Sequence, residues 1–296
     1  MAGGYWLAGR TLAPIEQLRQ EAAAISAHTM GQRRRLGDHL PNDEVGRLAR
    51  TFDDMLARLD AVFQQQRRFT ADASHELRTP LSIIRGEIDV ALERPRTPTM
   101  YVQVLTSIRA EAERMSRLVA DLLWLSRSDN RQLSLQVEPL DLAELLEALV
   151  EQLAGAAETA GVHLKLAMSP PIPLCGDMDR LLQLFLNLLD NAITYAPGST
   201  VTVRVHPEPH TVRVEVADTG PGIPAEHLPH LFERFYRVDP ARSREQGGSG
   251  LGLAIAQEIA QAHGGHIQVS SILHAGTTFT VTLPRMAPGC PQGLLP

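Results

Sequence analysis

The chain has 296 residues, a length that predicts roughly two domains, and its formal net charge is −6. This acidic balance argues against a nucleic-acid-binding protein, which is usually basic. Lys165 is the only lysine, so the sequence contains no P-loop, whose phosphate-binding motif ends in Gly-Lys-Ser/Thr. The two cysteines, Cys175 and Cys290, fit no metal-ligand spacing.

Residues 1–9 are short, apolar and aromatic, and the sequence leaves two interpretations of them open. They are the end of a membrane helix whose earlier part is missing, or a frayed terminus. No apolar run reaches the ~20 residues that span a bilayer. Residues 10–62 hold two segments with apolar residues at helical spacing, separated by a connector rich in Gly, Arg and Pro. The second segment is expected to begin near Asp43 or Glu44.

A pair of long helices is predicted over residues 63–130. The first extends to about Glu93, the two prolines of "RPRTPT" (94–99) break it, and a return helix covers about 100–128. Both helices carry an apolar stripe. A hairpin this narrow cannot bury its stripes alone, so two chains are expected to form a four-helix bundle.

The stretch "SHELRTPL" in the first of these helices contains a candidate nucleophile, His75. At helical spacing His75 lies nearly opposite the apolar stripe, Thr79 shares its exposed face, and Glu76 lies at the stripe's edge. A carboxylate beside a histidine can take its N–H proton and leave the other ring nitrogen free to attack. Pro80 predicts a kink because it has no N–H for the carbonyl of Glu76. By themselves these residues fit a solvated surface histidine better than a nucleophile.

From about residue 131 to 286 the pattern changes to alternating strands and helices, which predicts an α/β sandwich with helices on one face of a mixed sheet. The fold class is therefore multi-domain, an all-α helical hairpin followed by an α/β sandwich. Helices are expected at about 141–160, 177–195 and 250–263, and strands at 133–140, 162–168, 200–206, 211–218, 266–271 and 277–284. Residues 287–296 form a Pro/Gly tail that is expected to be disordered.

The helix at 177–195 carries a polar stripe on an otherwise apolar sequence. Asn187 and Asn191 lie one turn apart in this stripe. Mg²⁺ takes oxygen ligands, and the carbonyl oxygen of an Asn side chain is one of them. The alternative is an amphipathic helix whose amides face water.

Two glycine clusters follow that helix in the sequence. "VADTGPGIP" ends a strand at Asp218, and its glycines allow a tight turn and a close approach to a ligand. Asp218 can accept a hydrogen bond from an exocyclic amine. "GGSGLGLAI" precedes a helix, whose N-terminal N–H groups suit phosphates. Either cluster alone would be a weak signal, but their order after the Asn-bearing helix is more specific. The polar segment 238–246 between them is expected to be a mobile lid.

Together these motifs resemble the cytoplasmic part of a bacterial two-component sensor histidine kinase. "SHELRTPL" resembles the H box of that family, "NLLDNAITYAP" its N box, "DTGPGIP" its G1 box, "FERFYR" its F box and "GGSGLGLAI" its G2 box. Order and spacing agree over about residues 65–284. Residues 10–62 resemble a HAMP linker. The resemblance implies a dimerisation and phospho-acceptor domain at 63–130 and a catalytic ATP-binding domain at 131–286.

The resemblance also implies a role for each matching residue. His75 is the implied phospho-acceptor, Glu76 the base, and Thr79 the residue that positions water for dephosphorylation of the partner. Asn187 is the implied Mg²⁺ ligand. Thr194 stands where the family often has a basic residue, and an arginine, Arg237 or one in the lid, is expected to compensate. The implied ATP-binding residues are Asn187, Asn191, Tyr195, Asp218, Gly220, Gly222, Arg237, Gly248, Gly250, Leu251 and Gly252.

The function that the resemblance implies is an ATP- and Mg²⁺-dependent protein-histidine kinase. It is expected to act as a homodimer, to phosphorylate itself on His75, to pass the phosphoryl group to an aspartate of a response regulator, and to have phosphatase activity. No nucleic acid is expected as a partner. The chain is expected to be the cytoplasmic portion of an inner-membrane protein, joined to the membrane through an N-terminal segment that is missing. Two alternatives remain: a non-catalytic dimeric signalling scaffold, and another ATPase of the same nucleotide-binding superfamily.

Overall fold

The computed structural model describes residues 44–129, 135–169, 171–239 and 248–286. Residues 1–9, the first segment and connector of 10–62, most of the expected lid and the tail at 287–296 lie outside the described residues. The chain divides into two compact units, residues 1–74 and 75–296. The helix Glu44–Leu92 (α2) crosses this boundary, and the other described helices and strands belong to the second unit.

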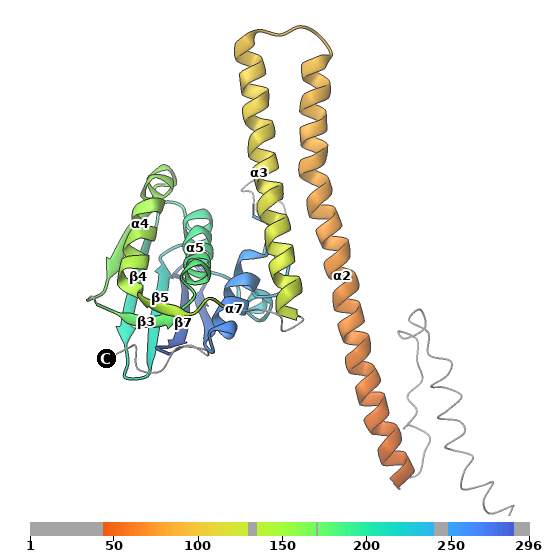
Figure 1. Ribbon diagram of the computed structural model, residues 1–296, viewed down its shortest axis with the longest axis vertical. Helices are drawn as coiled ribbons and strands as arrows, with labels where there is room; N and C mark the ends of the chain where they lie inside the picture. The colour runs from red at the N-terminus through yellow and green to blue at the C-terminus, as the bar shows by residue number, and fades with distance from the viewer. Residues whose placement is uncertain (1–43, 130–134, 170, 240–247, 287–296) are drawn as a thin grey trace, which may run out of the picture. The chain divides into compact units, whose positions relative to one another are not determined.

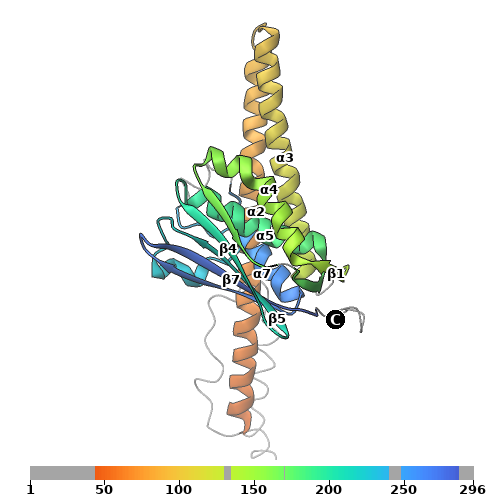
Figure 2. The same ribbon diagram turned by 90° about the vertical axis from the view of Figure 1, so that its left-hand side faces the viewer.

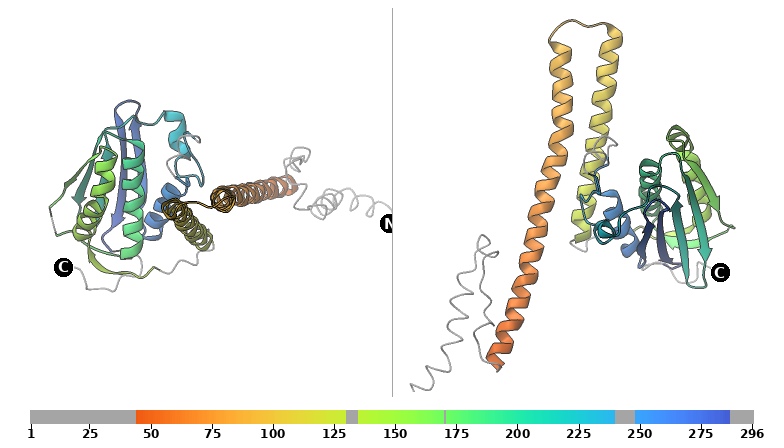
Figure 3. Two further views of the ribbon diagram at one scale, coloured as in Figure 1. Left: turned by 90° about the horizontal axis from the view of Figure 1, so that it is seen from above. Right: turned by 180° about the vertical axis from the view of Figure 1, so that it is seen from behind.

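Two long helices form the first part of the fold. Helix α2 (Glu44–Leu92) joins the second segment of 10–62 to the first hairpin helix without interruption, and it remains helical on both sides of Pro80. Helix α3 (Pro98–Asp129) returns alongside the last part of α2 (Figures 1 and 3). Between the two helices the hydroxyl of Ser107 donates to Oε1 of Glu87 at 2.6 Å. The predicted hairpin and its break are confirmed.

A mixed sheet forms the centre of the α/β part, as the sequence predicts, and it has five strands. The strand expected at 133–140 is not one of them, because the strand there covers Glu138–Asp141 (β1) and belongs to a separate sheet. The order of the five strands is β2-β4-β5-β7-β6, with β2 parallel to β4 and every other pair antiparallel. The strands are β2 (His163–Ala167), β4 (Thr200–Pro207), β5 (Thr211–Asp218), β6 (His266–Ile272) and β7 (Gly276–Pro284). Alternate valines of β4 and β5 are buried, while the residues between them are partly or fully exposed, so one face of the sheet belongs to the core.

Three helices cover that face of the sheet: α4 (Leu142–Thr159), α5 (Met178–Tyr195) and α7 (Gly252–Ala262). Figure 2 shows strands β4, β5 and β7 in front of α5 and α7. Asp141 caps α4 as predicted, because its Oδ1 accepts a hydrogen bond from the backbone N–H of Ala143 at 2.9 Å. Among the described residues, the largest fully buried side chains are Phe185 of α5 and Phe279 of β7, which belong to the core between the two layers.

Two elements were not expected from the sequence. Strand β3 (Pro173–Gly176) pairs with β1 (Glu138–Asp141) in a small separate sheet. The 3₁₀ helix η3 (Ala225–His230) follows the first glycine cluster. Both are short and contain or begin with proline, so neither shows an apolar periodicity that sequence reasoning can detect.

Candidate functional site

Helix α5 places a row of polar side chains beside the second glycine cluster. Its N-cap Asp177 accepts from the backbone N–H of Arg180 at 3.1 Å, which fixes the first turn. One face of α5 is buried in the core through Leu181, Leu184, Phe185, Leu188, Leu189, Ala192 and Ile193. The opposite face is left partly or fully exposed and carries Gln183, Asn187, Asp190, Asn191 and Thr194. The polar stripe that was predicted from the sequence therefore lies on the face of α5 that borders a candidate site.

The side chain of Asn187 is oriented by α7. Its Nδ2 donates to the backbone carbonyl of Gly252, the first residue of α7, at 3.0 Å. A Cβ atom at Gly252 would lie 3.6 Å from Oδ1 of Asn187. With the nitrogen engaged, the amide oxygen is the atom that Asn187 can offer to a cation.

Asp218 is held at the end of β5 by backbone donors. Its Oδ1 accepts from the N–H of Gly220 at 2.8 Å and from the N–H of Thr277 at 3.3 Å. Burial raises the pKa of the Asp218 carboxyl above its usual value, and these hydrogen bonds oppose the rise. A Cβ at Gly220 would lie 2.4 Å from the Cβ of Ala196, so only glycine allows the loop to fold back onto the end of α5.

The F-box segment and the second glycine cluster hold each other through backbone contacts. The N–H of Phe235, which has a φ of 63°, donates to the carbonyl of Gly250 at 2.8 Å. Gly250 also has a positive φ, 73°, and a Cβ there would lie 2.8 Å from the carbonyl carbon of Phe235. Nη2 of Arg237 donates to the carbonyl of Gly248. Leu251 is fully buried.

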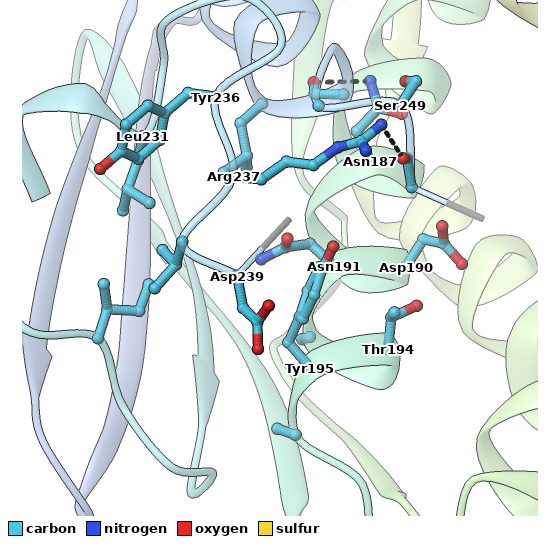
Figure 4. Close-up of a pocket in the computed structure, with 18 of the residues that line it drawn as sticks. Asn187, Asp190, Asn191, Thr194, Tyr195, Leu231, Tyr236, Arg237, Asp239 and Ser249 are labelled. Carbon is cyan, nitrogen blue, oxygen red and sulfur yellow. Dashed lines mark hydrogen bonds between the residues drawn. The ribbon is translucent and has the colours of Figure 1, made fainter. Parts of the chain in front are cut away.

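These elements enclose a cavity of about 620 Å³. In Figure 4, Asn191 and Tyr195 of α5 and Arg237 and Asp239 of the facing segment extend into the same space. Nine of the sequence-derived ATP-binding residues line the cavity: Asn187, Asn191, Tyr195, Asp218, Gly222, Arg237, Gly248, Gly250 and Gly252. Gly220 and Leu251 are not among the lining residues, since Gly220 packs on Ala196 and Leu251 belongs to the core.

His75 and Thr79 lie outside this cavity, whereas Glu76 lines it. His75 and Thr79 are both exposed, and the hydroxyl of Thr79 donates to the carbonyl of His75 at 3.3 Å. Oε2 of Glu76 accepts from Nη2 of Arg237 at 2.9 Å. The Glu76 carboxylate is therefore bonded to an arginine of the cavity, and its expected contact with His75 is not the one that this structure forms.

Sequence reasoning missed the contribution of α3 to this cavity. Arg114, Arg117 and Asp121 line it from α3, Tyr236 lines it from the F box, and Asp239 lines it from the start of the expected lid. Burial raises the pKa of Asp121 to about 6, and the charge of Arg117 works against this rise. The three α3 residues are spaced by three and four positions, which places them on one helix face. That spacing was the available signal, but it is common on solvated helices.

Comparison with known families matches three regions of the chain. The "His Kinase A (phospho-acceptor) domain" matches residues 65–131, the "Histidine kinase-, DNA gyrase B-, and HSP90-like ATPase" matches residues 176–287, and the "HAMP domain" matches residues 6–61. A phospho-acceptor helix pair that is followed by an ATPase fold of this type defines the class of protein as a histidine kinase.

Individual relatives agree with this class. The signal transduction histidine-protein kinase BaeS of Escherichia coli is 37% identical over 281 residues, which cover 95% of this chain and 59% of BaeS. The sensor protein CutS of Streptomyces coelicolor is 39% identical over 285 residues, 96% of this chain and 68% of CutS. The solved structure of Acinetobacter baumannii histidine kinase AdeS matches with a TM-score of 0.59 and 27% identity, over 71% of this chain and 98% of that chain. The chain belongs to the family of sensor histidine kinases, and it spans roughly three fifths to two thirds of the length of these two relatives.

Proposed function

We propose that this chain is an ATP-dependent kinase that phosphorylates itself on His75 and passes the phosphoryl group to an aspartate of a response regulator. One observation carries the proposal furthest. Glu76, the neighbour of an exposed histidine, bonds Arg237, and Arg237 lines the same cavity as Asn187 and Asp218. The residue next to the candidate acceptor histidine is therefore in direct contact with an arginine of the candidate nucleotide pocket.

The cavity residues fit ATP with Mg²⁺. Asp218 keeps one carboxylate oxygen, Oδ2, beyond its backbone bonds, and this oxygen suits the exocyclic amine of adenine. The oriented amide oxygen of Asn187 suits Mg²⁺, and the N-terminus of α7 suits phosphates. Arg237 is 8% exposed, and its Nε has no hydrogen-bond partner among the described residues. A buried guanidinium with an unused donor fits an anionic ligand.

In the reaction that we propose, a ring nitrogen of His75 attacks the γ-phosphorus of ATP. The bond from that phosphorus to the bridging oxygen breaks, ADP leaves, and Glu76 takes the proton of the other ring nitrogen. Thr79, exposed on the same helix one turn later, is proposed to position the water that dephosphorylates the response regulator. Asn191, Tyr195 and the glycines of the two loops are proposed to shape the nucleotide site.

We further propose that the chain works as a homodimer. Apolar side chains at helical spacing on α3 are exposed in the single chain, namely Val102, Leu105, Val119 and Leu123. On α2, Leu81 is 57% and Ile88 is 40% exposed. A second copy would cover such faces in a four-helix bundle.

The relation to a membrane rests on the HAMP match at residues 6–61, and we propose that residues 10–62 are a linker to a membrane-anchored segment. The chain would then be the cytoplasmic portion of a cell-membrane protein. Among the described residues, no helix combines the length and apolar character of a membrane span.

Incubation of the full chain with Mg²⁺ and γ-labelled ATP tests the proposal. The expected result is acid-labile, base-stable label that is lost in His75→Gln. His163→Gln is the matched control, since His163 is an exposed histidine far along the chain on β2, and it should keep the label. Label that persists in His75→Gln would contradict the assignment of His75 as the nucleophile. ATP binding without any label in the wild type would favour the non-catalytic scaffold.

A further inference from the structure

The pair Glu76–Arg237 is built from two groups that the proposed reaction needs for other tasks. Its Oε2–Nη2 distance is 2.9 Å, and the side chains are 20% and 8% exposed, so the pair is largely shielded from water. Shielding from solvent strengthens an ion pair of this geometry. As a base, Glu76 must offer its carboxylate to His75, and as a phosphate ligand, Arg237 must offer its guanidinium to ATP.

Among the described residues, the other two arginines that line the cavity also lie near carboxylates. The lining residues include three arginines, Arg114, Arg117 and Arg237, against the five carboxylates of Glu76, Asp121, Asp190, Asp218 and Asp239. Nη1 of Arg114 lies 3.7 Å from a carboxylate oxygen of Glu111, and Arg117 faces Asp121. A triphosphate that enters this cavity therefore meets arginines that already lie near carboxylates.

Arg237 is the arginine best prepared to change partner. A guanidinium has five N–H donors in a planar fork. In Arg237, Nη2 serves both Glu76 and the carbonyl of Gly248, while Nε is buried without an acceptor in the described part of the chain. A phosphate can engage two edges of the fork at once, which a single carboxylate oxygen does not.

We propose that the carboxylate of Glu76 and the phosphates of ATP compete for Arg237. When the triphosphate takes the guanidinium, Glu76 is released, and its carboxylate becomes available for the N–H proton of His75. This exchange rests on the proposed function, and it couples nucleotide binding to the supply of the base. A phosphate and the Glu76 carboxylate repel each other in a shielded cavity, which favours exchange over a shared guanidinium.

The exchange predicts an unusual effect of Glu76→Gln. Loss of the competing carboxylate should tighten binding of Mg²⁺-ATP roughly tenfold, the effect expected of one charge-assisted hydrogen bond. The same substitution should slow labelling of His75, because a base is lost. The effect on affinity should be largest for ATP, smaller for ADP and absent for AMP, which has fewer phosphates to compete.

A double-mutant cycle in the full chain separates competition from simple repulsion. Nucleotide dissociation constants are measured by titration calorimetry for wild type, Glu76→Gln, Arg237→Gln and the double variant. Competition predicts that Glu76→Gln has no effect in the Arg237→Gln background, whereas repulsion between charges predicts that the tightening persists there. Asp89→Asn removes the same charge from an exposed position of α2 and should leave affinity unchanged.

The outcomes distinguish this inference from the proposed function. Unchanged or weaker ATP binding in Glu76→Gln overturns the exchange while labelling of wild type on His75 stands. Tightening that survives in the Arg237→Gln background also overturns it. Failure of the wild type to bind ATP would instead contradict the proposed function. Thermal unfolding of each variant verifies that the comparison is made on folded protein.

Discussion

The Nε2 atom of His263 accepts a hydrogen bond from the backbone N–H of Asp177 at 3.0 Å. The other ring nitrogen, Nδ1, lies 2.8 Å from the carbonyl of Ile259, and a carbonyl can only accept, so Nδ1 carries the proton. His263 is therefore a neutral imidazole of defined tautomer. It joins the C-cap of α7 to the N-cap of α5, the helix that carries the polar row of the site.

Protonation of His263 should destabilise the fold. Burial lowers the pKa of His263 below its ordinary 6.5. A group with a lowered folded-state pKa contributes stability that is complete above about pH 6.5 and is lost as the pH falls. We expect His263→Gln to be less stable than wild type by about 1 kcal/mol at pH 7.5, with a smaller difference at pH 5.5. Thermal unfolding at both pH values measures this, and a difference that does not change with pH would refute it. The exposed His163→Gln serves as control.

Asp121 should show the opposite dependence on pH. Burial raises its pKa from 3.8 to about 6, and its Oδ1 accepts from Nε2 of Gln183 at 3.4 Å. A raised folded-state pKa gives a contribution that is present at low pH and is lost as the pH rises through about 6. Asp121→Asn should therefore raise the thermal midpoint at pH 7.5 and leave it nearly unchanged only below the unfolded-state pKa of 3.8, at about pH 3.5. Asp89→Asn on α2, exposed and paired with Arg85, is the control and should shift neither. A lower midpoint at pH 7.5 would mean that attraction to Arg117 outweighs the cost of burial.

Gly222→Ala should be destabilising. Gly222 has a φ of 68°, and a Cβ there would lie 2.2 Å from the carbonyl oxygen of Ile272, the last residue of β6. Strain in this backbone region costs about 1–3 kcal/mol. Gly155→Ala on α4 is the matched control, since a Cβ at Gly155 would meet no atom within 4 Å, and it should stabilise by roughly 0.5–1 kcal/mol. Chemical denaturation of both variants tests the pair, and equal effects would argue against the close contact.

Asp218→Asn should weaken ATP binding with little loss of stability. The Asn oxygen can still accept from the N–H groups of Gly220 and Thr277, but its NH₂ group cannot accept from an adenine amine. Because a hydrogen bond to a charged group is lost, the affinity for ATP is expected to fall roughly tenfold or more. Titration calorimetry with ATP measures this, and an unchanged dissociation constant would remove Asp218 from adenine recognition.

Leu105→Glu should separate the proposed homodimer. Leu105 is 64% exposed on α3 in the single chain, so a charge there costs little unless a second copy covers it. Light scattering should report twice the chain mass of 32.4 kDa for wild type and the single mass for the variant. Thr106→Glu adds the same charge at the next exposed position of α3 and should remain dimeric. If both variants were monomeric, or if both were dimeric, the assignment of the Leu105 face of α3 to the dimer interface would be contradicted.

Most of the fold followed from local patterns. The periodicity of α3, the Asp141 cap and the alternating valines of β4 and β5 each depend on neighbours within a few residues, which sequence reasoning can assess. Strand β3 was missed because four residues that follow prolines show no period. They become a strand only by pairing with β1, some 35 residues away in the sequence.

The sequence by itself determined which functional residues the site contains: an exposed histidine on a helix, two amides one turn apart, and an aspartate before a glycine loop. These are consequences of residue type and helical spacing. Only the tertiary structure decided that Glu76 bonds Arg237, 161 residues further on, and that Arg114, Arg117 and Asp121 line the same cavity. Such contacts are set by the packing of elements that are remote in sequence, and no local pattern records them.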